Sequence, residues 1–264
     1  MNARLIACSA LAATFLASAS IAQQATPPTR QPQPQAAAAQ GQELYHVHFV
    51  KAAPGKISEL ISAYQEAPVA QGEPGPPVIL RHLQGDDWDL LVLTPLGKDE
   101  TITTATTPEE QRSIERMRGL TSQHVDTFTS GPPWADVRAT LLGDAARPTG
   151  TAGGATGTIY TVTTYRSIPG HRDQLADTLR RIAGLYPDRR TTMQHIEGAP
   201  WEFVMLSRYD SWAALGEDQA PAADKLRSQG FASNEAIGLE LRQHVAEHRD
   251  TIAEMVTPAA KAVR

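Results

Sequence analysis

An internal repeat is the feature of this chain that most constrains its fold. Three pairs of matching segments occur in the same order along the chain: LYHVHFVKAAPGKISELISAY from residue 44 and IYTVTTYRSIPGHRDQLADTL from residue 159, RHLQGDDWDLLVL from residue 81 and QHIEGAPWEFVML from residue 194, and HVDTF from residue 124 and HRDTI from residue 248. Landmarks repeated in a fixed order indicate that one unit is present twice. We call residues 43–142 the first half and residues 158–256 the second half.

Each half is predicted to begin with a strand followed by a helix. The strands, residues 44–51 and 159–166, are rich in β-branched and aromatic residues, which fit a pleated sheet. A Pro-Gly pair then precedes the helix. Apolar residues recur there at helical spacing, namely Ile57, Leu60, Ile61 and Tyr64 in the first half and Leu175, Leu179 and Ile182 in the second.

A two-stranded hairpin follows in each half, and a second helical region is expected to close it. In the second half this closing helix is predicted from an apolar stripe at Leu241, Val245, His248, Ile252 and Met255. Residues 137–142 are the candidate for a fourth strand in the first half, and the second half has no clear equivalent.

This order of elements is the split βαβ, ferredoxin-like plan of an α+β fold. One such sheet carries helices on only one face. The segments WDLLVL and WEFVML are nevertheless apolar at alternate residues of both parities, which is typical of strands covered on both faces. We therefore expect two tandem ferredoxin-like units whose sheets pack against each other.

The remaining segments set the expected domain boundaries. Residues 1–22 have the charged start, the apolar stretch and the small residues before a cleavage site that mark a secretory signal peptide, so a periplasmic or secreted protein is expected. Residues 23–42, rich in Pro, Gln and Ala, are expected to be disordered. Residues 143–157 are expected to be a linker and residues 257–264 a tail.

Composition excludes several functions. Cys8 is the only cysteine and lies in the expected signal peptide, so the mature chain has neither a disulfide nor a thiol nucleophile. The chain carries 24 Lys and Arg against 29 Asp and Glu and shows no basic stripe, which argues against a nucleic-acid partner. After the leader no segment has the roughly 18 apolar residues of a membrane helix. Nucleophile-elbow, P-loop and dinucleotide-binding motifs are absent.

The repeated hairpin carries the first candidate site. With Gly85 and Gly198 at the turns, each histidine falls opposite a carboxylate, on the face away from Trp88 and Trp201. We expect the two tryptophans to be core anchors. A carboxylate that fixes the tautomer of a histidine suits a general base, and the alternative is a structural cross-strand pair. The candidate catalytic residues are His82 with Asp89 and His195 with Glu202.

His46 and His48 form the second candidate site. Residues two apart on a strand point the same way, so the pair has a spacing that can bind a metal ion. The second half has Thr161 and Thr163 there, and the third ligand nominated from the sequence is His82. The alternative is a polar strand face without a metal. A small-molecule pocket is expected to be lined by His46, His48, His82 and His195.

The repeated His-x-Asp-Thr sequence is interpreted as structural. Asp and Thr favour helix caps and turns, and His248 falls on the predicted apolar helical stripe. We therefore expect His124 and His248 to be capping or buried histidines.

The element order, the helix starts PGK and PGH, and WEFVMLSRYDSWAAL at residues 201–215 resemble the dimeric α/β-barrel superfamily, in particular its antibiotic-monooxygenase-like and NIPSNAP-like branches. The resemblance implies that the two units form one intramolecular barrel, present as a monomer or a homodimer. It also implies a range of activities, including cofactor-free oxygenases, isomerases and haem-handling enzymes. No branch-defining catalytic motif is present, so no family residue is carried over.

Three functions follow as expectations. The first is a small-molecule-binding barrel with cofactor-free monooxygenase- or isomerase-type activity. The second is a non-catalytic periplasmic binding or interaction module. The third is a metal- or haem-binding barrel that uses His46 and His48.

Overall fold

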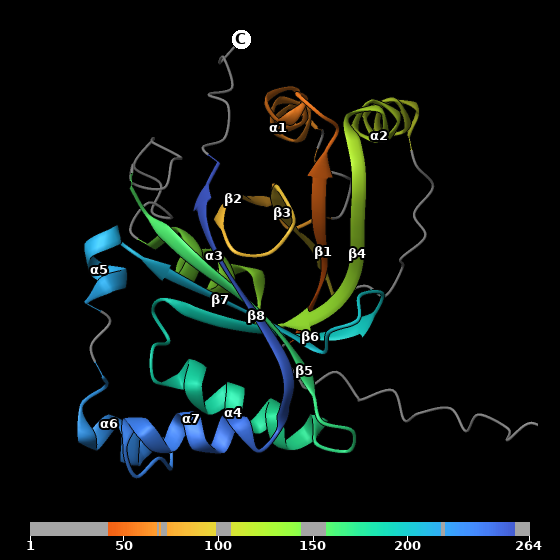
Figure 1. Cartoon of the computed structure of the whole chain (residues 1–264). Helices are drawn as coiled ribbons and strands as arrows, with labels where there is room; N and C mark the ends of the chain where they lie inside the picture. The colour runs from red at the N-terminus through yellow and green to blue at the C-terminus, as the bar shows by residue number, and fades with distance from the viewer. Residues whose placement is uncertain are drawn as a thin grey trace, which may run out of the picture. The chain divides into compact units, whose positions relative to one another are not determined.

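The computed structural model describes residues 42–67, 69, 73–98, 107–143, 157–217 and 220–256. The expected signal peptide, the spacer up to residue 41, residues 144–156 of the linker and the tail lie outside the described residues. The first half contains β1 (Glu43–Ala52), α1 (Ile57–Glu66), β2 (Val78–Gln84), β3 (Leu90–Gly97), α2 (Pro108–Leu120), β4 (Thr121–Gly131) and α3 (Trp134–Leu142). The second contains β5 (Ile159–Ser167), α4 (Arg172–Gly184), β6 (Arg190–Glu197), β7 (Phe203–Tyr209), α5 (Trp212–Gly216), α6 (Ala223–Ser228), α7 (Asn234–Arg242) and β8 (Val245–Met255) (Figure 1).

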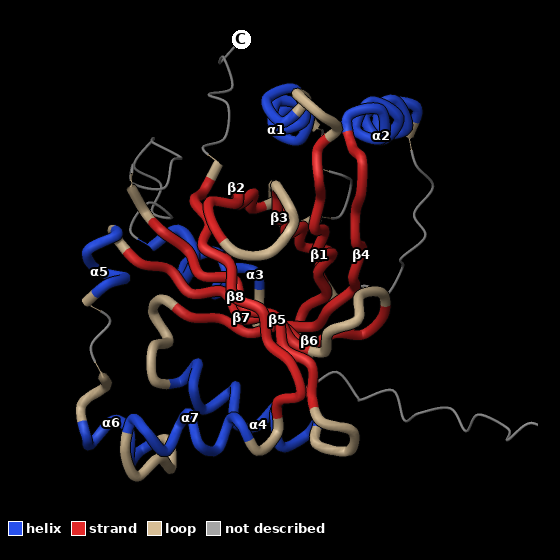
Figure 2. The backbone as a smooth tube through the Cα atoms, in the orientation of Figure 1, coloured by secondary structure: helices blue, strands red, loops and turns tan. Residues whose placement is uncertain are grey.

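The eight strands form one closed antiparallel barrel. Its strand order is β1-β3-β2-β8-β5-β7-β6-β4 (Figure 2). The four strands of the first half therefore run β4-β1-β3-β2, and those of the second run β8-β5-β7-β6. The two sets meet where β2 pairs with β8 and where β4 pairs with β6. The chain is thus an α+β protein of ferredoxin-like type, and closure leaves the sheet no free edge.

Both faces of the strands are covered, as the apolar hairpin segments predict. Alternate residues such as Tyr45, Val47 and Phe49 fill the barrel interior together with residues of the second half, including Tyr160 and Val204. The opposite faces pack under helices. Val92 of β3 lies in a cluster with residues of α1 and α2, and Phe203 of β7 lies in a cluster with residues of α4 and α7.

One end of the barrel is filled by α3. Trp134, Val137 and Leu141 of this helix belong to the interior cluster. The hydroxyl of Tyr160 donates a hydrogen bond to the carbonyl of Leu141 at 2.7 Å. The prediction of a strand over residues 137–142 was therefore wrong. The segment is helical because an apolar helix face seals the open end of the barrel.

The predicted closing helix with the stripe from Leu241 to Met255 was also wrong. Helix α7 ends at Arg242, and β8 runs from Val245 to Met255 between β5 and β2. Backbone pairing on both sides and burial of Thr251 and Ala253 outweigh the local helical spacing. The repeated His-x-Asp-Thr sequences lie on β4 and β8, so the fourth strand of each half is the segment predicted as helical.

These strands explain why the hairpin glycine occurs in both halves. The backbone of Gly198 lies so close to β4 that a Cβ atom there would be 2.1 Å from the carbonyl oxygen of Asp126. The next residue, Ala199, donates its N–H to the Thr127 hydroxyl at 3.2 Å. In the reciprocal contact, Gly85 approaches Asp250, and the N–H that follows it donates to the Thr251 hydroxyl at 3.2 Å. Each hairpin is therefore clasped by the fourth strand of the other half.

Candidate functional site

The hairpin histidines do not form the predicted pairs with carboxylate side chains. The backbone register is the one inferred from the turn, since the N–H of His82 donates to the carbonyl of Asp89 at 2.9 Å. The carboxylate of Asp89, however, accepts the N–H of Ala52 at 2.7 Å. In the second half the N–H of His195 likewise meets the carbonyl of Glu202, and the Glu202 carboxylate accepts the N–H of Ser167. The two acids are bound to the ends of β1 and β5, which corrects their assignment as partners of a general base.

The rings of His82 and His195 lie beside the tryptophans rather than on the opposite face. The ring centroids of His82 and Trp88 are 5.5 Å apart, and those of His195 and Trp201 are 6.0 Å apart. Each tryptophan is buried, as expected of a core anchor. The Nε2 atoms of both histidines are buried and have no hydrogen-bond partner among the described residues. Burial and the neighbouring Arg172 lower the pKa of His195, so its neutral form is favoured.

His46 and His48 lie elsewhere, on the outer face of β1. Their neighbours Tyr45 and Val47 point into the barrel, so the histidines point outward. They meet β4, with Asp126 directly opposite His48, whereas His82 on β2 pairs with β8. The expectation of one pocket lined by all four histidines, and of His82 as third metal ligand, was therefore wrong. Strand order separates them because β3 lies between β1 and β2.

A hollow of about 460 Å³ lies at the barrel end opposite α3. Its inner wall is aromatic, with Phe49 5.3 Å from Trp88 and 6.1 Å from Trp201 between ring centroids. Charged residues of both halves also line it: Lys51, Asp86, Asp87, Arg166, Glu247 and Arg249. Several of these charges pair with each other, as Arg249 does with Glu247 at 2.9 Å and with Asp86 at 3.2 Å. The charged residues that line this hollow therefore form ion pairs with one another.

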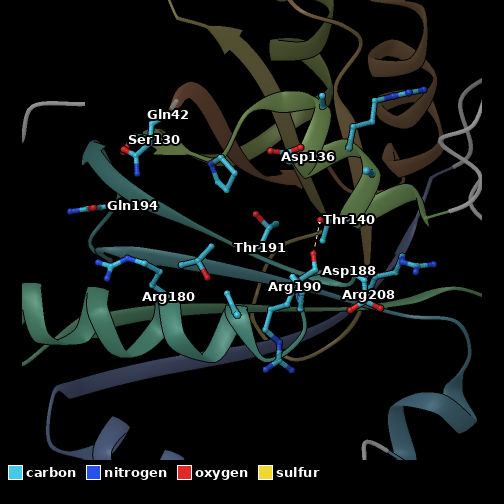
Figure 3. Close-up of a pocket in the computed structure, with 18 of the residues that line it drawn as sticks. Gln42, Ser130, Asp136, Thr140, Arg180, Asp188, Arg190, Thr191, Gln194 and Arg208 are labelled. Carbon is cyan, nitrogen blue, oxygen red and sulfur yellow. Dashed lines mark hydrogen bonds between the residues drawn. The ribbon is translucent and has the colours of Figure 1, made fainter. Parts of the chain in front are cut away.

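A larger cavity of about 1280 Å³ lies between α3 and α4, beside β6 (Figure 3). Small residues on both helices create the space: Ala135 and Ala139 on α3, and Ala176, Ala183 and Gly184 on α4. In Figure 3, Asp136 lies on the α3 side, Arg180 on the α4 side, and Thr191 of β6 between them. Sequence reasoning missed this cavity because alanine and glycine carry no motif.

Unsatisfied polar atoms gather in the wall of this cavity, which we call the α3–α4 cavity. The hydroxyls of Thr191 and Thr192 and the Nε of Arg208 are buried and have no hydrogen-bond partner among the described residues. Arg208 is held in place by Asp210, whose carboxylate accepts a hydrogen bond from Nη1 at 2.7 Å. Arg190 donates from Nε to the Ser207 hydroxyl at 2.9 Å. Successive strand residues point to opposite faces, so Thr191 and Arg208 share the inner face of β6 and β7 and Thr192 points to the other face. Buried polar groups are nearly always bonded, so Thr191 and Arg208 identify this part of the wall as a place for a polar ligand or water.

Comparisons with known proteins identify the fold. No family model matches the chain, and no curated protein matches it. Among solved structures, an anthrone oxidase-like protein is similar with a TM-score of 0.52 and 18% identity over 83% of this chain and 93% of that chain. A "putative monooxygenase" from Lactobacillus acidophilus is similar with a TM-score of 0.50 and 8% identity over 83% and 98% of the two chains. Another from Fusobacterium nucleatum has a TM-score of 0.56 and 10% identity over 84% and 96%.

These likenesses span both halves, because each covers more of the chain than either half contains. Within the described residues, no helix has the length and apolar character needed to cross a membrane. The chain therefore shares the fold of monooxygenase-like proteins, an α+β arrangement with an eight-stranded antiparallel sheet.

Proposed function

We propose that the protein is a small-molecule-binding α/β barrel with monooxygenase-type activity, and that its substrate occupies the α3–α4 cavity. The observation that carries this proposal is the pair of unpartnered polar atoms on Thr191 and Arg208, which alternation along β6 and β7 places on the same, inner face of the sheet. The descriptions of the similar solved structures support the reaction class. An isomerase reaction in the same cavity is the alternative chemistry.

The donor set indicates the class of ligand. The Nε–H of Arg208 can only donate, and threonine hydroxyls donate or accept. A ligand carrying a carbonyl, phenol or carboxylate oxygen would satisfy them. The cavity is open and exceeds the roughly 300–1,000 Å³ of typical ligand sites, so it has room for a multi-ring molecule. We therefore infer an oxygenated ring compound.

The reaction would need no added reductant for a substrate such as anthrone, a tricyclic ketone. One O₂ is taken up, the ring CH₂ becomes a carbonyl, and one water is released. Two hydrogens leave the carbon, one oxygen atom enters the product and the other leaves as water, so atoms and electrons balance. The residues that line the α3–α4 cavity would bind and orient the substrate and would exclude part of the water.

We further propose that the chain is a tandem duplication in which one chain supplies both units of the barrel. The identical strand order of the two halves and the reciprocal hairpin clasps support this. The leader sequence supports export to the periplasm or medium.

Binding and turnover can be tested separately. A thermal-shift screen of oxygenated ring compounds, with anthrone included, would be followed by oxygen-electrode assays. Thr191→Val should weaken the binding of a hit several-fold, because it removes one hydrogen-bonding group without changing the volume of the side chain. The control is Thr164→Val, which changes the hollow at the opposite barrel end. A loss of binding in Thr164→Val alone, or no binding by any oxygenated ring compound, would contradict the α3–α4 assignment.

A non-catalytic binding protein is the second candidate function. It is favoured by one observation, namely that Asp89 and Glu202 are engaged by backbone N–H groups and leave His82 and His195 without acid partners. Binding at Thr191 with no oxygen uptake and no change in the bound compound would select this function.

A further inference from the structure

Four polar side chains meet on the outer face of β1 and β4. These strands lie side by side in Figure 1, with α1 and α2 at one end. The antiparallel register places Asp126 opposite His48 and His124 opposite Val50. Asp126 accepts a hydrogen bond from His46 Nε2 at 2.8 Å on one oxygen and lies 2.7 Å from His124 Nδ1 on the other. His48 Nε2 lies 3.4 Å from the first oxygen.

Three of these groups present donor atoms suited to one metal ion. His48 and His124 each offer a ring nitrogen and Asp126 a carboxylate oxygen, all within 4.8 Å of one another. Ligands about 2.0–2.2 Å from a shared zinc ion have such separations. His46 is hydrogen-bonded to Asp126 from the neighbouring position on β1, and its ring stacks on that of His48 with centroids 5.4 Å apart.

His48 is positioned in the way that metal-binding histidines usually are. Its Nδ1 lies 3.2 Å from the Tyr64 hydroxyl on α1, which can accept the ring N–H. This leaves Nε2 directed toward Asp126, and Nε2 is buried with no hydrogen-bond partner among the described residues. The backbone of Asp126 is fixed from the other side by Gly198 of the second half. His48 and Asp126 are therefore held in position on two sides in the absence of a metal ion.

The second half provides an internal comparison. It retains His248 and Asp250, but Thr161 and Thr163 occupy the positions of His46 and His48, and Leu179 that of Tyr64. Thr163 donates a hydrogen bond to Asp250 at 2.7 Å. The same strand pairing therefore forms without the extra histidines and tyrosine. The fold does not need His46, His48 or Tyr64, so their presence in the first half calls for another explanation.

We propose that His48, His124 and Asp126 bind one divalent transition-metal ion of the zinc class on the outer face of the first half, with His46 and Tyr64 as positioning residues. Two imidazoles and a carboxylate suit Zn²⁺, Co²⁺ and Fe²⁺ better than Mg²⁺ or Ca²⁺, which prefer all-oxygen sites. His124 and Asp126 are exposed, so the ion keeps positions open to water on that side. The site is separate from the α3–α4 cavity and does not depend on the function proposed for it.

The test uses full-length mature protein without a histidine tag, stripped with a chelator. Co²⁺ is titrated and followed by its visible absorbance, and Zn²⁺, Mg²⁺ and Ca²⁺ are added as competitors. We expect saturation at one Co²⁺ per chain, displacement by Zn²⁺, and none by Mg²⁺ or Ca²⁺. His48→Ala and His124→Ala should each lower affinity more than tenfold. Tyr64→Phe should lower it about tenfold, the lower end of the effect of groups that orient a ligand.

The matched control is His248→Ala, which removes the equivalent histidine of the second half and should leave Co²⁺ affinity unchanged. His124 is exposed, so His124→Ala remains informative if His48→Ala fails to fold. Failure of the wild-type protein to bind Co²⁺ and Zn²⁺ would overturn the proposal. So would equal losses in His124→Ala and His248→Ala, since the metal would then not distinguish the two halves.

Discussion

The hairpin clasp predicts a large loss of stability when Gly198 is replaced by alanine. The residue has φ of +119°, a conformation that costs a residue with a side chain about 1–3 kcal/mol. Its Cβ would also lie 2.1 Å from the Asp126 carbonyl oxygen and 2.9 Å from the Thr127 Cα. Both are backbone atoms of a paired strand, so relieving the overlap adds about 1–3 kcal/mol. The free energy of unfolding should fall by about 2–6 kcal/mol.

Gly170→Ala separates strain from steric overlap. This glycine has φ of +86°, but nothing lies within 4 Å of its Cβ position, so only the backbone cost of about 1–2 kcal/mol applies. Urea unfolding followed by circular dichroism gives both free energies. Gly85→Ala should behave like Gly198→Ala, because its Cβ would be 2.4 Å from the Asp250 carbonyl oxygen. If Gly198→Ala and Gly170→Ala are equally destabilising, the hairpin does not depend on close contact with β4.

Three further predictions concern the clasp, the hairpin acids and the buried histidine. Thr127→Val should cost about 1–3 kcal/mol in urea unfolding, because it leaves the buried Ala199 N–H without its acceptor, whereas Thr191→Val should cost little. Asp89→Ala should lower the melting temperature through loss of the Ala52 contact, yet leave turnover per folded molecule unchanged; a selective loss of turnover would restore Asp89 as a catalytic residue. In metal-free protein, the free energy of unfolding should fall as the pH drops from about 6.5 to about 4. In this range His48 is protonated in the unfolded chain but stays neutral in the folded protein, which costs roughly 3 kcal/mol. His48→Gln should flatten this part of a pH–stability curve, leaving the smaller contribution of His195.

Repetition in the sequence predicted the fold better than local periodicity did. The strand, helix and hairpin of each half lie where matching landmarks put them, and strands apolar on both faces are covered on both faces. Residues 245–255 were misassigned because their apolar residues also fit a helical spacing. What makes this segment a strand is pairing with β5 and β2, and β2 is more than 160 residues away in sequence. Local patterns contain no information about such partners.

The candidate sites were harder to predict for the same reason. His46 and His48 were identified as possible ligands from their spacing, but the third group depends on which strand lies beside β1. The neighbour is β4, so the ligands come from the His-x-Asp-Thr sequence that had been interpreted as a capping motif. The hairpin acids were placed in the correct register, yet side-chain torsions direct them to the backbone N–H groups of Ala52 and Ser167. A register fixes backbone neighbours, whereas side-chain partners depend on the packing around them.

The differences between the halves carry more functional information than the repeats. Features present in both halves, such as the hairpin glycine, the threonine that clasps it and the acid that binds a strand end, all hold the barrel together. The candidate sites instead lie where the halves differ. Thr191, Thr192 and Arg208 of the cavity correspond by the hairpin alignment to Val78, Ile79 and Pro95.

The proposed metal site follows the same rule in part: His124 and Asp126 are repeated as His248 and Asp250, but Thr163 and Leu179 replace His48 and Tyr64 in the second half. An interaction that closes a two-fold barrel is needed twice, once at each junction between the halves. A ligand site is needed only once, and polar groups that serve it are costly to bury elsewhere. Buried polar groups that have no counterpart in the other half are therefore the first to mutate in a search for function. Buried polar groups that have a counterpart are the ones to mutate in a study of what stabilises the barrel.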